Sequence, residues 1–137
     1  MTSPVILSGN ILSGNILSGN ILTELSKTEF YQVLLSNPGV VILKFGAEWC
    51  GPCKLIEAQV KELMEKMPAD KTVNAIIDVD ESIDLYMFLK NKKMVKGIPT
   101  ILCYKRGNTD FAPDDCVIGA DPIDVNAFFS RCLSYIS

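Results

Sequence analysis

Residues 40–45 form the segment that most limits what this chain can fold into. They read Val-Val-Ile-Leu-Lys-Phe, and the only polar residue among them is Lys44. A strand with one buried face shows alternating polar and apolar residues, whereas a nearly continuous apolar run is typical of a strand buried on both faces. Such a strand needs helices above and below it, so the sequence predicts an α/β fold with this segment at the centre of the sheet.

The chain from residue 23 onward supplies the helices and further strands that this sheet requires. A capping box at 26–29, Ser-Lys-Thr-Glu, predicts a short helix that ends near residues 37–39. Apolar residues at helical spacing predict helices over 53–67 and 81–93 and a closing helix whose N-cap is Asp121. Strands are expected at 73–80, at 100–104 and at about 116–118.

The composition excludes several classes of function. The chain has 137 residues, 48% hydrophobic and 21% charged, which fits one compact domain with a substantial core. A net charge of −3 and a pI of about 4.9, without a lysine or arginine block, argue against nucleic acid as a partner. The absence of histidine excludes a Ser-His-Asp triad and a His-ligated zinc site.

The first 22 residues are organised differently from the rest. The sequence Ile-Leu-Ser-Gly-Asn occurs at 6–10, 11–15 and 16–20, and Ile21 and Leu22 begin a fourth copy. This period does not place the Ile-Leu pairs on one face of a helix, and Ser-Gly-Asn favours a turn, so a chain that folds back in every copy is conceivable. We divide the chain into a repeat-containing extension at 1–22 and a domain at 23–137. The extension is either a loosely ordered segment or a docking segment for a protein partner.

The sequence lacks the features of an exported or membrane-spanning protein. Its first basic residue is Lys27, and polar residues interrupt the apolar pairs of the repeat. Its apolar runs are much shorter than a membrane-spanning helix. We therefore expect no membrane partner and a cytoplasmic location.

Two of the cysteines, Cys50 and Cys53, are separated by only two residues. They follow the predicted central strand and open the next helix, where unpaired backbone N–H groups and the helix dipole lower a thiol pKa, and Cys50 is the better placed of the two. One helical turn brings the two sulfur atoms within disulfide distance, while Pro52 stiffens the turn and Gly51 leaves the approach open. A reversible dithiol is expected here.

Other uses of this cysteine pair fit the sequence less well. A zinc site needs four ligands, and the chain has neither a second Cys-X-X-Cys pair nor a histidine, so we expect no metal. A permanent structural disulfide has little purpose in a core of this size without an export signal. The remaining cysteines fall on apolar faces of predicted elements, and we expect Cys103, Cys116 and Cys132 to be buried.

Three motifs together resemble the thioredoxin family over about residues 22–137. These are Trp-Cys-Gly-Pro-Cys-Lys at 49–54, Gly-Ile-Pro-Thr at 97–100 before a predicted strand, and Gly119 in the penultimate turn. A Cys-X-X-Cys pair alone would be weak support, but the three motifs and the element order agree independently. The resemblance implies a thioredoxin-like fold with a central mixed β-sheet of four to five strands and helices on both faces.

The resemblance also implies roles for individual residues. Cys50 would attack a substrate disulfide, and Cys53 would resolve the mixed disulfide that forms. The peptide bond before Pro99 would be cis and would place the Ile98 backbone beside the sulfur atoms. Active-site tuning would involve Lys44, Trp49, Gly51, Pro52 and Pro99, and substrates would bind at Trp49, Ile98, Pro99, Gly119 and Ala120.

The sequence departs from the family pattern at two positions near the cysteines. Lys44 stands where the family usually has a buried aspartate that accepts a proton from the resolving thiol. Because a buried ammonium is costly, we expect Lys44 to tune the dithiol, either partly neutral or paired with a carboxylate such as Glu57. The alternative is a lysine whose side chain merely reaches the sheet edge. Ala58 replaces the proline that bends the following helix in the family, so a straighter helix is expected.

The function that the resemblance implies is reduction of protein disulfides. The protein would carry electrons from a thioredoxin-reductase-like donor to oxidised protein substrates and help to maintain cell redox homeostasis. We expect no bound cofactor, because the chain has no Gly-rich nucleotide loop. The motif leaves the direction of transfer open, because the reduction potential depends on thiolate stabilisation. The alternative is a thioredoxin-fold structural or interaction module that its N-terminal repeat anchors in a larger assembly.

Overall fold

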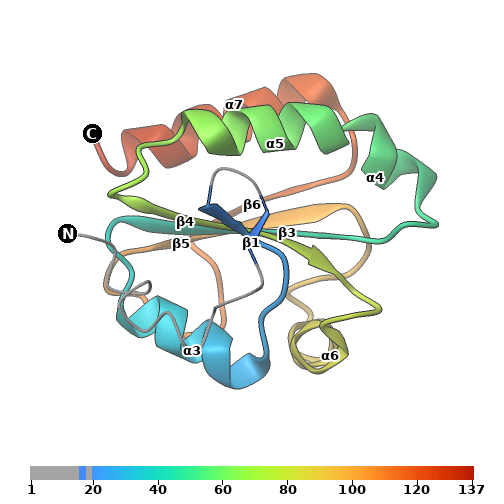
Figure 1. Ribbon diagram of the computed structural model, residues 1–137, viewed down its shortest axis with the longest axis horizontal. Coiled ribbons are helices and arrows are strands. Elements are labelled where there is room, and N and C mark those ends of the chain that lie inside the picture. Colours follow the sequence, from blue (N-terminus) through green and yellow to red (C-terminus); the bar gives the residue numbers. More distant parts are fainter. Residues whose placement is uncertain (1–15, 18–19) are drawn as a thin grey trace.

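The computed structural model describes residues 16–17 and 20–137, which form one β-sheet with helices on both faces (Figure 1). Within these residues the strands follow the order β1-β2-β4-β3-β5-β6. The strands are β1 (Ile16–Leu17), β2 (Ile21–Leu22), β3 (Val40–Gly46), β4 (Thr72–Asp78), β5 (Thr100–Lys105) and β6 (Asp115–Ile118). The helices are α3 (Lys27–Leu35), α4 (Gly51–Leu55), α5 (Glu57–Lys66), α6 (Ile83–Asn91) and α7 (Pro122–Ser134). The α/β class is confirmed, and the two-residue β1 adds one strand to the five expected at most.

The predicted central strand is the centre of the sheet. β3 pairs with β4 in parallel and with β5 antiparallel, and all seven of its residues are buried. Successive side chains of a strand point to opposite faces of the sheet, so a strand buried throughout must be covered on both sides. The apolar run at 40–45 therefore predicted both the position of this strand and the layered architecture.

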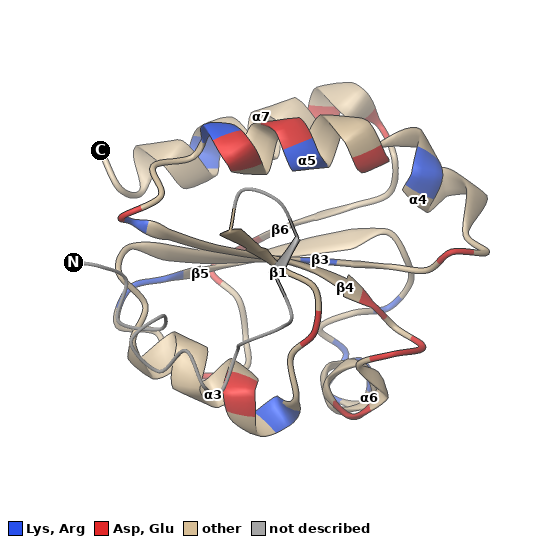
Figure 2. Cartoon of the chain, in the orientation of Figure 1, with Lys and Arg blue, Asp and Glu red and all other residues tan. Residues whose placement is uncertain are grey.

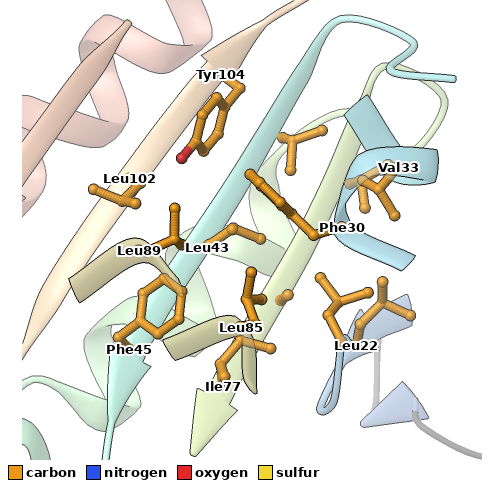
Figure 3. Packing of buried hydrophobic residues seen from close by; sticks show 14 of the residues in the cluster. Leu22, Phe30, Val33, Leu43, Phe45, Ile77, Leu85, Leu89, Leu102 and Tyr104 are labelled. Atoms are coloured by element: carbon orange, nitrogen blue, oxygen red, sulfur yellow. The ribbon is translucent and has the colours of Figure 1, made fainter. Parts of the chain in front are cut away.

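Two hydrophobic clusters attach the helices to the sheet. Figure 3 shows the first, in which Leu43 and Phe45 of β3 pack near Leu85 and Leu89 of α6 and near Phe30 of α3. The second cluster lies on the opposite face, beneath α5 and α7. Its members come from the sheet and from both helices and include Val40, Ile42, Ile101, Val60, Met64, Val125 and Phe128. Alternate residues of β3 thus enter alternate clusters.

The last complete copy of the repeat and the beginning of the next form a β-hairpin at the edge of the sheet. Ile16 pairs with Leu22, and Leu17 pairs with Ile21. Asn20, at the end of the connecting turn, has a φ of 65°, a left-handed conformation that asparagine tolerates better than most residues. β2 then pairs in parallel with β4. The chain folds back between β1 and β2, which the turn residues made conceivable. The copies at 6–10 and 11–15 lie outside the described residues.

Residues on both sides of the boundary at 22/23 belong to the same sheet. Ile21 is fully buried in the cluster beneath α5 and α7, whereas Leu22 is buried in the cluster near α3 and α6. One Ile-Leu pair therefore contributes one side chain to each face of the sheet. The described fold begins within the repeat.

The helix boundaries follow the capping signals in the sequence. Ser26 caps α3, and its side chain accepts a hydrogen bond from the Glu29 backbone while the Glu29 carboxylate accepts one from the Ser26 backbone. Asp121 caps α7 through the backbone N–H of Ile123 at 2.9 Å, with Pro122 in the first turn. Both predicted N-caps are confirmed. No helix in the described ranges is long and apolar enough to cross a membrane.

The prediction of one straighter helix over residues 53–67 is wrong. The segment is divided into α4 and α5 at Ile56, whose φ of −109° and ψ of 6° are not helical. Ile56 is fully buried and packs in the cluster beneath α5 and α7. Burial of this side chain fixes the turn between the helices, so the bend persists although residue 58 is alanine.

The prediction that all three remaining cysteines are buried is wrong for one of them. Cys103 and Cys132 are buried, but Cys116 is exposed. Cys116 belongs to β6, the outermost strand on its side of the sheet, where Val117 is the only buried residue. An edge strand of this kind has one solvated face, and Cys116 lies on it.

Candidate active site

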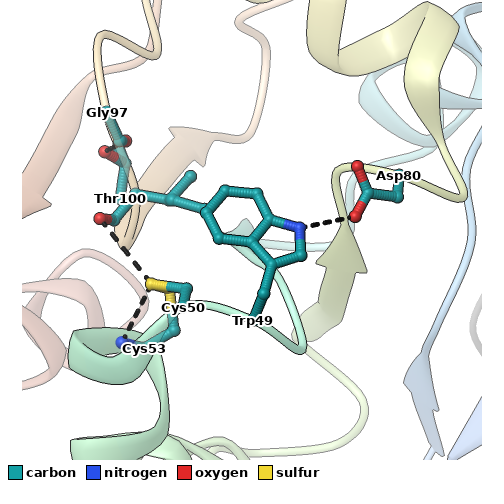
Figure 4. Close-up of a disulfide and its surroundings, with 7 residues drawn as sticks. Trp49, Cys50, Cys53, Asp80, Gly97 and Thr100 are labelled. Carbon is teal, nitrogen blue, oxygen red and sulfur yellow. Dashed lines mark hydrogen bonds between the residues drawn. A yellow bond between two sulfur atoms is a disulfide. The ribbon is translucent and has the colours of Figure 1, made fainter.

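The two paired cysteines lie where the central strand gives way to a helix, and they form a disulfide (Figure 4). β3 ends at Gly46, a short loop follows, and α4 begins at Gly51. The Cα atoms of Cys50 and Cys53 are 5.3 Å apart, within the usual range for a disulfide. The prediction that one helical turn brings the two sulfur atoms together is confirmed.

Cys50 is the N-cap residue of α4, and its sulfur takes the place of a capping oxygen. The backbone N–H of Cys53 donates a hydrogen bond to the Cys50 sulfur at 3.2 Å. When the disulfide is reduced, this donor points at the group that carries the negative charge of a thiolate. Such a bond favours the ionised form of a thiol, so the geometry supports the expected nucleophile at Cys50.

The turn between the cysteines is open to solvent. Gly51 and Pro52 are both exposed, and a side chain added at Gly51 would meet no atom within 4 Å. Pro52 lies in the first turn of α4, where its missing N–H costs no helical hydrogen bond. A bulky partner can therefore approach the disulfide over this turn.

A second loop, which directly precedes β5, lies beside the disulfide. The Ile98–Pro99 peptide bond is cis, as the resemblance implied, and the Ile98 carbonyl oxygen lies 4.0 Å from the Cys50 sulfur. The backbone N–H of Gly119 donates to the Pro99 carbonyl at 2.9 Å, which ties the turn after β6 to this loop. Ile98, Gly119 and Ala120 are half-buried, whereas Pro99 is buried. The structure thus places Ile98 beside the Cys50 sulfur and Gly119 against Pro99.

Trp49 has a partner that the sequence reasoning missed. Its side chain is 69% exposed, and its indole N–H donates to a carboxylate oxygen of Asp80 at 2.8 Å (Figure 4). Asp80 follows β4 and lies far from Trp49 in the sequence. The only available signal was the parallel pairing of the two strands, which places the segments after β3 and β4 at the same edge of the sheet.

Gly46 is a second residue that the sequence reasoning missed. A Cβ atom on Gly46 would lie 3.3 Å from the Cys53 sulfur, which is tighter than most contacts of this kind. The missing side chain therefore lets Cys53 pack directly against the end of β3. Cys53 is only 3% exposed.

Lys44 is buried in β3 and lines a cavity behind the disulfide. Figure 2 shows that charged residues lie mostly on helices and loops, whereas β3 contains a single charged residue. The cavity has a volume of about 340 Å³, and Cys53 and Glu57 also line it. Burial lowers the pKa of Lys44, and the charge of Glu57 offsets only part of that effect. The lysine as a whole is 4% exposed.

The chemical groups at this site suit reversible thiol chemistry. In the ranges that the structure describes, no group of three or more His, Cys, Asp or Glu side chains is arranged to hold a metal ion. The exposed Cys116 and the buried Cys103 and Cys132 are free thiols. The bridged pair, Cys50 and Cys53, lies between the end of β3 and the cis-Pro99 loop.

Comparisons with known proteins agree with this arrangement. The sequence profile of the family Thioredoxin matches residues 21–125. Thioredoxin of the fungus Coprinus comatus is 27% identical over 110 residues, which cover 80% of this chain and 96% of that protein. Thioredoxin of Bacillus subtilis is 42% identical over 72 residues, which cover 53% of this chain and 64% of that protein.

Two solved structures of similar shape are also thioredoxins. The crystal structure of Malassezia sympodialis thioredoxin superimposes with a TM-score of 0.65 at 28% identity, covering 81% of this chain and 92% of that one. The oxidised form of mitochondrial thioredoxin 3 from Saccharomyces cerevisiae superimposes with a TM-score of 0.61 at 30% identity, covering 80% and 93%.

Proposed function

We propose, because this chain belongs to the thioredoxin family, that it carries electrons from a thioredoxin-reductase-like donor to oxidised proteins. Its activity is thiol–disulfide oxidoreduction through the Cys50–Cys53 pair. The observation that carries the proposal is the disulfide at the start of α4, with the Cys53 N–H bonded to the Cys50 sulfur and the Ile98 carbonyl beside it. A purely structural role is not favoured, because both cysteines are present and bridged.

The proposed reaction begins with the reduced protein. The Cys50 thiolate attacks one sulfur of a substrate disulfide, which forms a mixed disulfide and releases the other substrate sulfur as a thiolate that takes a proton from solvent. The Cys53 thiol loses its proton and attacks the Cys50 sulfur. The Cys50–Cys53 disulfide forms, and the second substrate sulfur leaves as a thiol. Two electrons pass from the dithiol to the substrate, and the donor then reduces the disulfide again.

The proposed substrate surface lies around Cys50. An extended substrate segment can accept or donate backbone hydrogen bonds at Ile98, as strands do at a sheet edge. The exposed Trp49 ring offers an apolar contact that is anchored at one end by Asp80. Gly119, which is hydrogen-bonded to Pro99, and the adjoining Ala120 are small residues that leave room for a substrate to approach the Pro99 loop. Substrate contacts of this kind orient the target disulfide for attack.

The proposed location is the cytoplasm, where small dithiol proteins are kept reduced. Some similar proteins are named mitochondrial thioredoxins, among them those of mouse and rat, so location varies among relatives. Cell fractionation tests the location.

A protein partner for the N-terminal repeat is also proposed, because its Ile-Leu pairs form a regular apolar pattern in the sequence. A pull-down with a chain that lacks residues 1–15 tests the partner of the repeat.

The activity is tested by the reduction of insulin with dithiothreitol as the electron source. The full chain should accelerate the reaction, and Cys50→Ser should abolish the acceleration. Cys116→Ser is the matched control, because it removes an exposed thiol outside the site and should leave the rate unchanged. A wild-type rate no faster than dithiothreitol alone would refute the proposal.

A further inference from the structure

A second cavity lies on the face of the sheet that α3 and α6 cover (Figure 1). Its volume is about 460 Å³, and among the described residues it shares no lining residue with the cavity behind the disulfide. Its walls come from α3, from α6 and from the loop between β5 and β6. Three segments that are distant in the sequence thus border a space in the size range of small-molecule sites. Nothing in the proposed reaction uses it.

The walls of this cavity are largely aromatic. Phe88 of α6 and Phe111 of the loop pack edge to face with ring centroids 5.8 Å apart, and both are half-buried. Tyr31 of α3 adds an exposed ring to the wall, while Phe30 and Leu34 of the same helix are buried. Aromatic rings attract one another beyond the effect of the area they bury. The cavity therefore suits a flat aromatic group.

The loop that carries Phe111 is held in place by hydrogen bonds. The hydroxyl of Tyr104, a fully buried residue of β5, donates to the Phe111 carbonyl at 2.7 Å. The side-chain amide of Asn108 donates to the Ala112 carbonyl at 2.9 Å and to the Asp114 carboxylate at 3.0 Å. This wall of the cavity is thus formed before a ligand arrives, which lowers the entropic cost of binding.

Two lysines approach the aromatic rings of the cavity. The Lys27 Nζ is 4.2 Å from the centre of the Phe88 ring, and the Lys92 Nζ is 6.0 Å from the same ring and 5.3 Å from the Phe111 ring. Both lysines are exposed, and neither forms an ion pair within residues 16–17 and 20–137. The rings hold the two ammonium groups by cation–π attraction but do not neutralise their charge. Both charges are therefore available to an anion beside Phe88.

The acidic residues nearest to these lysines in the sequence or in the cavity wall accept hydrogen bonds from the backbone. Asp110, which lines the cavity, accepts from the N–H of Phe111 at 2.8 Å. Asp84 accepts from the N–H of Lys27 at 3.2 Å and from the N–H of Leu85 at 2.7 Å. Between Asp84 and Asp110 the sequence contains several lysines and no acidic residue. This part of the molecule therefore favours an anion, although the net charge of the chain is −3.

We propose that the cavity between α3, α6 and the loop after β5 binds a planar aromatic anion, such as an aromatic carboxylate. The aromatic group lies against Phe88 and Phe111, and the anionic group is held by Lys27 and Lys92. Ring contacts supply the affinity, and the two charges select an anion over a neutral or cationic molecule of the same shape. The site is separate from the disulfide, so the proposal does not rest on the proposed function.

The test uses naphthoate, a planar aromatic carboxylate, as the probe. Its binding to the full chain is followed by NMR titration of the backbone amides. The largest shift changes should occur in α3, in α6 and at residues 106–114, with a Kd of about 1 mM or lower for a ligand of this size. The neutral analogue naphthylmethanol should bind about tenfold more weakly. Added salt should weaken the binding of naphthoate and leave that of naphthylmethanol unchanged.

Variants of the full chain separate the contribution of charge from that of the rings. Lys27→Met combined with Lys92→Met should weaken naphthoate binding about tenfold and leave naphthylmethanol binding unchanged. Lys66→Met, which removes an exposed lysine of α5, is the matched control and should change neither affinity. Phe111→Leu should weaken the binding of both probes, because a ring contact is lost.

Three results would overturn the proposal. The first is an unchanged naphthoate affinity in the double lysine variant. The second is a set of shift changes centred on Trp49 and Ile98, which would place the probe at the disulfide instead. The third is the absence of saturable binding, which would mean that another occupant, such as residues 1–15 or a second copy of the chain, fills the cavity.

Discussion

The substitution Ile21→Ala tests whether the last copy of the repeat is part of the core. Ile21 is 0% exposed, pairs with Asn74 of β4 and packs beneath α5 and α7. The three carbons that the substitution removes account for about 2.4 kcal/mol, at about 0.8 kcal/mol each. The cavity that the substitution leaves adds to this loss, because β2 is held between β1 and β4. We therefore expect the free energy of unfolding to fall by about 3 to 4 kcal/mol.

The assay is equilibrium unfolding of the oxidised protein in urea, followed by circular dichroism. Ile21→Ala should lower the midpoint and leave the slope unchanged, since the surface exposed on unfolding is nearly the same. Ile123→Ala is the matched control, because the same atoms are removed from a side chain that is 76% exposed. It should change the stability by less than about 0.5 kcal/mol. A loss at Ile21 no larger than at Ile123 would refute the inclusion of β2 in the cooperative fold.

Three further predictions concern charge and exposure. Lys44→Met should stabilise the oxidised protein by about 1 to 3 kcal/mol at neutral pH, measured by urea unfolding. The folded-state pKa of Lys44 lies below 10.5, so this gain in stability should shrink as the pH rises toward 10.5. Burial raises the pKa of Asp115, but hydrogen bonds from Arg131 and Tyr135 outweigh this effect and hold the pKa below 3.8. Arg131→Ala should therefore lower the free energy of unfolding by about 1 kcal/mol at neutral pH. This loss should disappear in acid, because Asp115 is then protonated. Trp49→Ala should lower kcat/KM for insulin about tenfold, while the midpoint of urea unfolding stays unchanged because Trp49 is exposed.

The local signals in the sequence predicted most of the elements because those elements depend on nearby residues. The capping box at 26–29 and the N-cap at Asp121 each act within one helical turn, and both are present in the structure. The apolar run at 40–45 predicted the central strand because burial on both faces leaves no polar alternation. The resemblance supplied the cis bond before Pro99, which no local pattern of this sequence requires.

The errors arise where packing between distant segments decides the outcome. Helical periodicity over 53–67 is the same for a continuous and a bent helix, so it could not reveal that the helix breaks at Ile56. The exposure of Cys116 depends on β6 being an edge strand, which a pattern within one strand does not show. The contact between Trp49 and Asp80 depends on the register of β3 with β4.

The central claim is that Cys50 attacks substrate disulfides and Cys53 resolves the intermediate. Its most direct test is to mix Cys53→Ser protein with insulin and identify the adduct by mass spectrometry after proteolysis. The account predicts a stable mixed disulfide between Cys50 and an insulin cysteine, because the resolving thiol is missing. An adduct that forms only at Cys116, or no adduct at all, would contradict the account.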